Sequence, residues 1–211
     1  MKTTRNAIVL SVLLVLCVTS ARAEFVGFTL EHPISLFPKI KYQYLDLDSS
    51  GSNTLSNDII FDSLSLTSGN LVASNYDLSH DDIVLYYEIL DNWVNLDFGL
   101  DIKVFDGEVA FVDSATATSS TIIIDETIPL IYLSARFDLP FNGFYIGADL
   151  NSARSGGSAI EDSSIMLGYA SDRGLGFEGG IKKFSLELND ITDANTNLEF
   201  DGIYLNGYYH F

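Results

Sequence analysis

The sequence of residues 93–105, WVNLDFGLDIKVF, alternates between apolar residues and polar or small residues. One parity is apolar from Val94 to Val104, and the other is polar, charged or glycine from Asn95 to Lys103. A period of two is typical of a β-strand whose two faces meet different surroundings. Strands of water-soluble proteins usually have about 5–6 residues, whereas a tilted membrane-crossing strand needs about 9–11. The length of this run therefore favours a transmembrane strand.

The C-terminus shows the same alternation and ends in an aromatic residue. Ile203, Leu205, Gly207, Tyr209 and Phe211 share one face. A terminal Phe that follows apolar residues at every second position resembles the targeting signal of bacterial outer-membrane barrels. We therefore predict that Tyr209 and Phe211 belong to an assembly signal. The expected partners in export are the outer-membrane assembly machinery and periplasmic chaperones.

The N-terminus has the three parts of a secretory signal peptide. Lys2 and Arg5 form a positive region, residues 7–18 form an apolar region, and residues 19–23 end in Ala-Arg-Ala. The apolar region is shorter than the ~20 residues that a membrane helix needs. We predict a signal peptide at 1–23, export by the Sec route, cleavage after Ala23 and a mature domain at 24–211. An uncleaved N-terminal anchor is the alternative.

Cleavage at this position would leave a strongly acidic chain without cysteine. It would remove Lys2, Arg5, Arg22 and the only cysteine, Cys17, and would change the net charge from −18 to −21. Nucleic acid is excluded as a partner, because phosphate binding needs a basic face. An acidic surface can instead reach lipopolysaccharide phosphates through divalent cations. We expect a monomer in the cell outer membrane with lipid and lipopolysaccharide as partners.

The alternating segments and the turns between them predict a barrel. Residues 91–92, 139–142 and 171–174 are short turns, and four longer polar segments are expected to be loops. Short turns that alternate with long loops are typical of outer-membrane barrels. We predict an all-β, transmembrane, antiparallel up-and-down β-barrel of eight strands. Nine or ten strands are the alternatives, since residues 25–31 and 59–66 could add strands. The expected loops are 49–77, 106–126, 152–160 and 189–197, and the expected strands are 39–48, 78–90, 93–105, 127–138, 143–151, 161–171, 174–188 and the C-terminal run.

The parity of each strand assigns its side chains to the lipid or to the lumen. Outward-facing residues beside the short turns should form an aromatic girdle. The carboxylates predicted to line the lumen outnumber the cations, so the cations should be paired, because an unpaired interior charge is costly. The predicted girdle is Tyr42, Tyr87, Phe137, Phe144, Tyr169, Phe177 and Tyr209. The predicted lumen lining is Glu88, Asp97, Asp101, Lys103, Arg136, Asp138, Asp149, Glu178 and Lys182.

This lumen supports two functions. Side chains can fill an eight-stranded barrel, which predicts a closed polar lumen, acidic extracellular loops and a structural or surface-interaction role. The alternative is a narrow cation-preferring or small-solute channel lined by Glu88, Asp97 and Asp101.

Patterns for catalysis and metal binding are weak. His80-Asp81-Asp82 loosely resembles the Asp and His residues at the mouth of omptin-type proteases, but His32 and His210 fall at the predicted periplasmic end. A lipid-modifying enzyme would also depend on His80. Residues 46–57 begin like a calcium loop but end in Asn57 instead of a bidentate Glu. We predict no catalytic residue, no cofactor and no defined metal site, with an outer-membrane protease or lipid-modifying enzyme as the least favoured alternatives.

Four segments resemble a family of small outer-membrane β-barrel proteins of Gram-negative bacteria, whose function is undefined. The resemblance implies a transmembrane barrel and implies no substrate or catalytic residue. Members of the family usually carry another strand and loop before the EHP segment, where this chain has only residues 24–30, so its first hairpin is shortened. The resembling segments are EHPISLFP (31–38), DLSHDDIVLYYEILDNWVNLDFGLDIKVFDG (77–107), LIYLSARFDLPFNG (130–143) and the closing HF (210–211).

Overall fold

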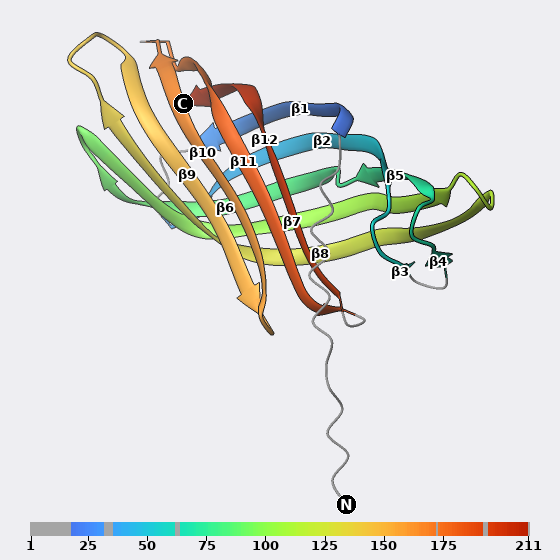
Figure 1. The fold of residues 1–211 in the computed structure, drawn as a ribbon. Coiled ribbons are helices and arrows are strands. Elements are labelled where there is room, and N and C mark those ends of the chain that lie inside the picture. The colour runs from blue at the N-terminus through green and yellow to red at the C-terminus, as the bar shows by residue number, and fades with distance from the viewer. Residues whose placement is uncertain (1–17, 32–35, 62–63, 172, 192–193, 211) are drawn as a thin grey trace, which may run out of the picture.

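The computed structural model describes residues 18–31, 36–61, 64–171, 173–191 and 194–210, and this part of the chain is built from twelve β-strands (Figure 1). It contains no helix that could cross a bilayer. The prediction of an all-β antiparallel chain is confirmed. The strands are β1 (Val18–Glu31), β2 (Lys39–Thr54), β3 (Ile59–Phe61), β4 (Leu64–Leu66), β5 (Leu71–Asp77), β6 (His80–Asp91), β7 (Val94–Asp113), β8 (Thr118–Asp138), β9 (Phe144–Ser155), β10 (Ser158–Ala170), β11 (Leu175–Ile191) and β12 (Ala194–His210).

Ten of these strands form one sheet that occupies nine strand positions. β5 and β6 lie end to end between β2 and β7, so together they fill one position. β1 pairs antiparallel with β2, and its Leu30 and Glu31 pair in parallel with Tyr209 and His210 of β12. Our preference for eight strands is wrong. Residues 25–30, which we considered only as a possible additional strand, pair with β2 along their whole length and so add a strand position. β1 begins at Val18, inside the predicted signal peptide, and cleavage stays a prediction.

The segments that we expected to be irregular loops mostly continue the strands. β7 and β8 pair without a break from Val94–Phe137 to Asp113–Thr118, although residues 106–126 were predicted to be a loop. β9 and β10 also pair up to Ser155–Ser158. The loop prediction is wrong because it was made from composition. Ser, Thr and Asp side chains on an exposed strand leave the backbone free to form the hydrogen bonds between paired strands.

The turn between β7 and β8 is fixed by a buried carboxylate. Asp113 accepts hydrogen bonds from Asn70 Nδ2 and from the Ala115 backbone N–H, each at 2.8 Å. These donors hold the pKa of Asp113 below its ordinary value, the Asn70 side chain most strongly. The far end of the hairpin is therefore tied to the segment that precedes β5.

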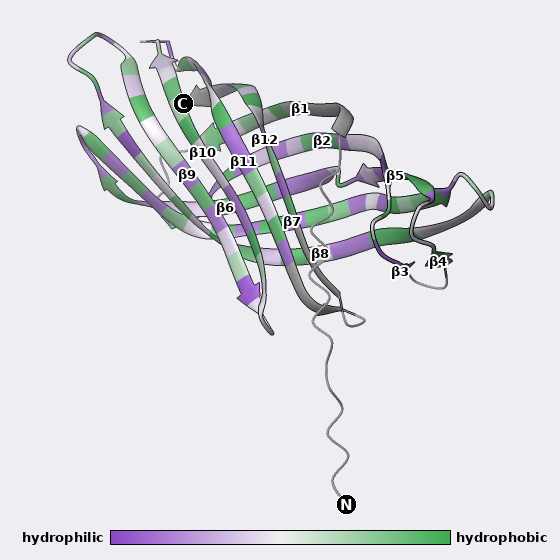
Figure 2. Ribbon diagram, viewed as in Figure 1, coloured by the Kyte–Doolittle hydropathy of each residue, from purple (hydrophilic) through white to green (hydrophobic). Residues whose placement is uncertain are grey.

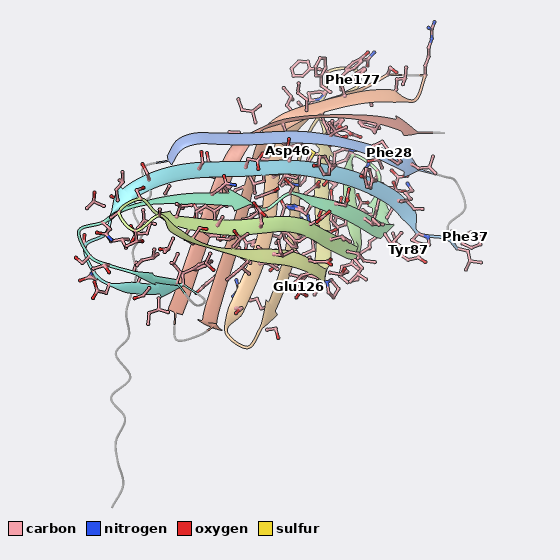
Figure 3. The ribbon with its side chains drawn as sticks, turned by 90° about the vertical axis from the view of Figure 1, so that its right-hand side faces the viewer. Phe28, Phe37, Asp46, Tyr87, Glu126 and Phe177 are labelled. Carbon is pink, nitrogen blue, oxygen red and sulfur yellow. The ribbon has the colours of Figure 1, made fainter. Side chains whose placement is uncertain are left out.

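Polar and apolar residues alternate along the strands (Figure 2), and the burial of their side chains shows that the two faces of the sheet exchange polarity part-way along. Near the short turns, the convex face is apolar, as at Phe98 and Leu100, and the concave face is polar. Farther along β2 and β7 the convex positions become Asp46 and Asp106, and the concave ones become Leu45, Leu47 and Phe105. Figure 3 shows the labelled aromatic side chains Phe28, Phe37 and Tyr87 toward the short-turn end, and Asp46 farther toward β3 and β4. One set of strands thus has an apolar exterior at one end and an apolar interior at the other.

The apolar interior lies between two layers of strands. β8 pairs with β9 only through residues 131–138, and beyond that point β9–β12 cross the layer of β2, β7 and β8 (Figure 1). The buried side chains of this inner core come from both layers; they are Leu45, Leu47, Leu78, Phe105, Leu130, Ile160 and Phe184. A second apolar cluster, with Leu55, Leu64, Leu66 and Val72, packs the β3–β4 hairpin against β5 and β7.

Gly99 lets the concave side of β7 lie directly against β6. A Cβ at this position would be 2.2 Å from the Leu85 carbonyl oxygen and 2.7 Å from Tyr86 Cα, which are backbone atoms. We expect Gly99→Ala to destabilise the fold by about 1–3 kcal/mol, because the strands must separate. The midpoint of urea unfolding in detergent, followed by Trp93 fluorescence, measures this. Gly179→Ala is the control, since its nearest contact is the flexible Leu205 side chain, and equal midpoints for the two variants would contradict the expectation.

Candidate functional site

A network of buried ion pairs crosses the interior where the two faces exchange polarity. Lys103 Nζ lies 2.5 Å from Asp82 Oδ1 and 3.1 Å from Asp162 Oδ2, and Lys182 Nζ lies 3.0 Å from Asp162 Oδ2. None of these side chains is more than 10% exposed. We call these residues, together with His80 and Asp101, the ion network.

The strand register brings the ion network together from two walls. Lys103 on β7 is directly opposite Asp82 on β6, and both face inward. Asp162 on β10 is opposite Phe184 of β11, next to the inward-facing Lys182. The ion pairs therefore join the strands β6 and β7 on one wall to the strands β10 and β11 on the other. Neither β6 nor β7 is a neighbour of β10 or β11 in the sheet.

The ion network has one more carboxylate than it has cations. Asp101 is fully buried, and neither of its carboxylate oxygens has a hydrogen-bond partner among the described residues. The carboxylates are Asp82, Asp101 and Asp162, and the cations are Lys103 and Lys182. A buried charge without a partner costs several kcal/mol in the folded state, so this cluster favours an additional cation.

His80 is enclosed by the same groups. Its Nδ1 lies 2.7 Å from the Leu78 carbonyl oxygen, and its Nε2 lies 3.9 Å from Asp82 Oδ1. The imidazole ring packs against the rings of Phe105 and Phe184, with centroids 4.9 Å and 5.3 Å away. Although its sequence context loosely resembles that of residues at the mouth of omptin-type proteases, the side chain of His80 is buried.

The ion network and the inner core fill the interior at this level. None of their thirteen residues is more than 8% exposed. Lys103 Nζ also lies 5.7 Å from the centre of the Phe184 ring, which joins the two groups. Side chains thus occupy the space that a water-filled passage would need.

A polar cavity lies on the other side of the ion network, toward the short turns. Its charged residues are largely paired: Lys41 Nζ lies 2.6 Å from Asp149 Oδ2, and Lys39 pairs with Glu88. Glu178 accepts hydrogen bonds from the Tyr145 hydroxyl and from Asn206 Nδ2, each at 2.9 Å. This cavity is a hydrogen-bonded polar interior with a mixed charge.

The structure divides the predicted lumen residues into three groups. Asp101, Lys103 and Lys182 belong to the ion network, and Asp138 lies apart at the end of β8, half exposed, 4.0 Å from Arg136. The partner of Lys103 and Lys182 that the sequence analysis missed is Asp162, although its position in the alternating run 161–171 is inward. Lys39 and Lys41 were missed in the same way. The remaining predicted residues, Glu88, Asp97, Arg136, Asp149 and Glu178, line the polar cavity.

The predicted girdle residues that can be placed lie on the convex face. Tyr42 is half-buried, donates a hydrogen bond to Asp81 and packs against Phe28. Tyr87, Phe137, Phe144, Tyr169 and Phe177 are exposed. Phe211 and the side chain of Tyr209 lie outside the described residues.

The calcium-loop alternative is wrong. Residues 46–54 belong to β2, which pairs with β1 and β5. A calcium loop of this type needs a tight turn at its glycine, whereas Gly51 is in an extended strand opposite Ser74.

Comparison with known proteins adds nothing to this geometry. The chain matches no known family model, no curated protein and no solved structure.

Proposed function

We propose that the nine strand positions close into a transmembrane barrel of a bacterial outer membrane, reached by Sec export and inserted by the outer-membrane assembly machinery. The support is the convex belt of apolar side chains near the short turns. Phe98 and Leu100 on β7, Leu133 on β8 and Ile146 on β9 are each 44–48% exposed. An apolar belt that continues over neighbouring strands is unusual on soluble monomers, and hydrocarbon is the solvent that suits it.

The barrel is proposed to be non-conducting, with a structural and surface-interaction role. The observation that carries this proposal is the interior filled by the ion network and the inner core. An ion or solute would need a continuous wet path lined by polar groups, and the inner core is apolar. This disfavours the cation-channel alternative.

The part beyond the apolar belt is proposed to stand outside the outer leaflet. Its apolar core is inside, and carboxylates such as Asp46, Asp106 and Asp125 lie on its exterior. Asp106 and Asp125 are directly opposite each other on neighbouring strands, where like charges repel unless a cation lies between them. Lipopolysaccharide phosphates bridged by divalent cations are the partner that this exterior favours. The chain is proposed to belong with the small Gram-negative outer-membrane barrels that its sequence resembles.

Planar-bilayer recording tests this proposal. Purified mature protein that migrates differently in unboiled and boiled samples, as folded barrels do, should give no single-channel steps. Steps that favour cations over anions would contradict it. Phe184→Ala with Phe105→Ala removes the two largest inner-core rings and serves as the comparison, since any leak should be larger in this variant than in the wild type.

A further inference from the structure

We propose that His80, Asp82 and Asp162 form a binding site for a divalent first-row transition metal of the Zn²⁺ type inside the molecule. One ligand atom from each of these residues lies within 4.8 Å of the others. Atoms that share a tetrahedral metal with bonds of ~2.0–2.1 Å are about 3.3 Å apart. The side chains therefore need only small rotations to close on one ion.

The histidine is held in the form that a metal requires. A carbonyl oxygen only accepts hydrogen bonds, so His80 Nδ1 must donate its proton to Leu78 at 2.7 Å. The neutral ring then carries its lone pair on Nε2. This Nε2 is buried and has no hydrogen-bond partner among the described residues. A backbone carbonyl on the other ring nitrogen is the usual way in which proteins orient a metal-binding histidine.

The lysines leave one oxygen of Asp82 available. Lys103 binds Asp82 through Oδ1, while Asp82 Oδ2 is buried without a partner in the part of the chain that is described. Both lysines contact Asp162 through Oδ2. Ligating carboxylates are commonly hydrogen-bonded on their second oxygen. Lys103 and Lys182 would remain as such outer partners.

The charge of the ion network also favours a cation. Asp101 adds a third carboxylate, whose two buried oxygens have no hydrogen-bond partner in the part of the chain that the structure describes. Asp101 is a diagonal neighbour of Asp82 across β6 and β7, since Lys103 stands opposite Asp82. It is therefore placed to offset the charge of the metal.

A small pocket lies between β2, β11 and β12, close to the ion network. It is lined by Leu45, Leu47 and Phe184 and includes Lys182, which binds the proposed ligand Asp162. Lys182 therefore lies between this pocket and the proposed site.

The donor set selects the class of metal. One imidazole nitrogen with carboxylate oxygens suits Zn²⁺, Co²⁺ and related ions. Ca²⁺ and Mg²⁺ take oxygen ligands almost exclusively, so they should compete poorly.

Co²⁺ is the probe for the test, because its visible absorption reports nitrogen and oxygen ligands in a tetrahedral site. Chelator-treated mature protein, folded in detergent, should bind one Co²⁺ per chain, and Zn²⁺ but not excess Mg²⁺ should displace it. His80→Gln and Asp82→Asn should each weaken binding at least about tenfold. Asp81→Asn is the matched control on the opposite face and should bind as the wild type does.

X-ray absorption of the Zn²⁺-loaded wild type provides a readout that needs no variant, and it should show one imidazole among oxygen ligands. Absence of saturable Co²⁺ binding in the wild type would overturn the proposal, and a proton would then be the extra cation. Unchanged binding in folded His80→Gln, or zinc surrounded by oxygen alone, would also overturn it, because the metal would then lie on the acidic exterior.

Discussion

Replacing Lys103 by Met should destabilise the folded protein by about 3–5 kcal/mol, because it leaves Asp82 and Asp162 without their shared buried cation. Met has a similar length and fills the space beside Phe184, so the lost charge rather than a cavity causes the effect. The midpoint of urea unfolding in detergent, measured with a chelator present, is the readout.

Asp101→Asn is the matched control for this charge effect. Asp101 is the surplus carboxylate of the ion network, and Asn keeps its shape while removing the charge. We expect the unfolding midpoint of this variant to equal or exceed that of the wild type. If both variants were destabilised alike, the network would not be short of positive charge, and our description of its balance would be wrong.

Replacing Leu100 by Arg should prevent most of the protein from reaching its folded form in the membrane. Leu100 projects from the convex face in the middle of the apolar run of β7, where a cation at the bilayer midplane costs about 2–4 kcal/mol. The amount of heat-modifiable protein in outer-membrane fractions measures the effect.

Asp106→Arg tests where the apolar belt ends. It lies on the same strand and the same face as Leu100, but beyond the exchange of polarity. We expect this variant to assemble at nearly the wild-type level, because its side chain meets water or headgroups. Equal loss in both variants would place the boundary elsewhere, and normal levels of Leu100→Arg would contradict the assignment of the convex face to lipid.

The alternation of the sequence predicted the strands near the short turns well. The alternation in residues 94–104 determines which side chains lie on the convex face and which on the concave face, because a shift by one residue would turn every side chain to the other face. The inward positions of Asp101 and Lys103 follow from that parity. Asp162 was equally readable from its own run, but pairing it with Lys103 requires knowing that β10 faces β7 across the interior, which no local pattern contains.

Two features could not be read from local patterns. The run around Leu45 and Leu47 keeps its period of two while its faces exchange surroundings, so periodicity alone does not show that the apolar side turns inward. The ninth strand position depends on Leu30 lying opposite Ile40, a pairing set by the fold rather than by the short segment itself.

The exchange of polarity has a consequence for the direction of insertion. In the proposed orientation, leaving the bilayer would require the β7–β8 hairpin to draw Asp106, Asp125 and their neighbours through hydrocarbon while its own apolar core came apart. The folded hairpin would therefore prevent the protein from moving back through the bilayer. The rate of escape would then be set by the rate at which this hairpin unfolds, and not by the contacts of the apolar belt with lipid.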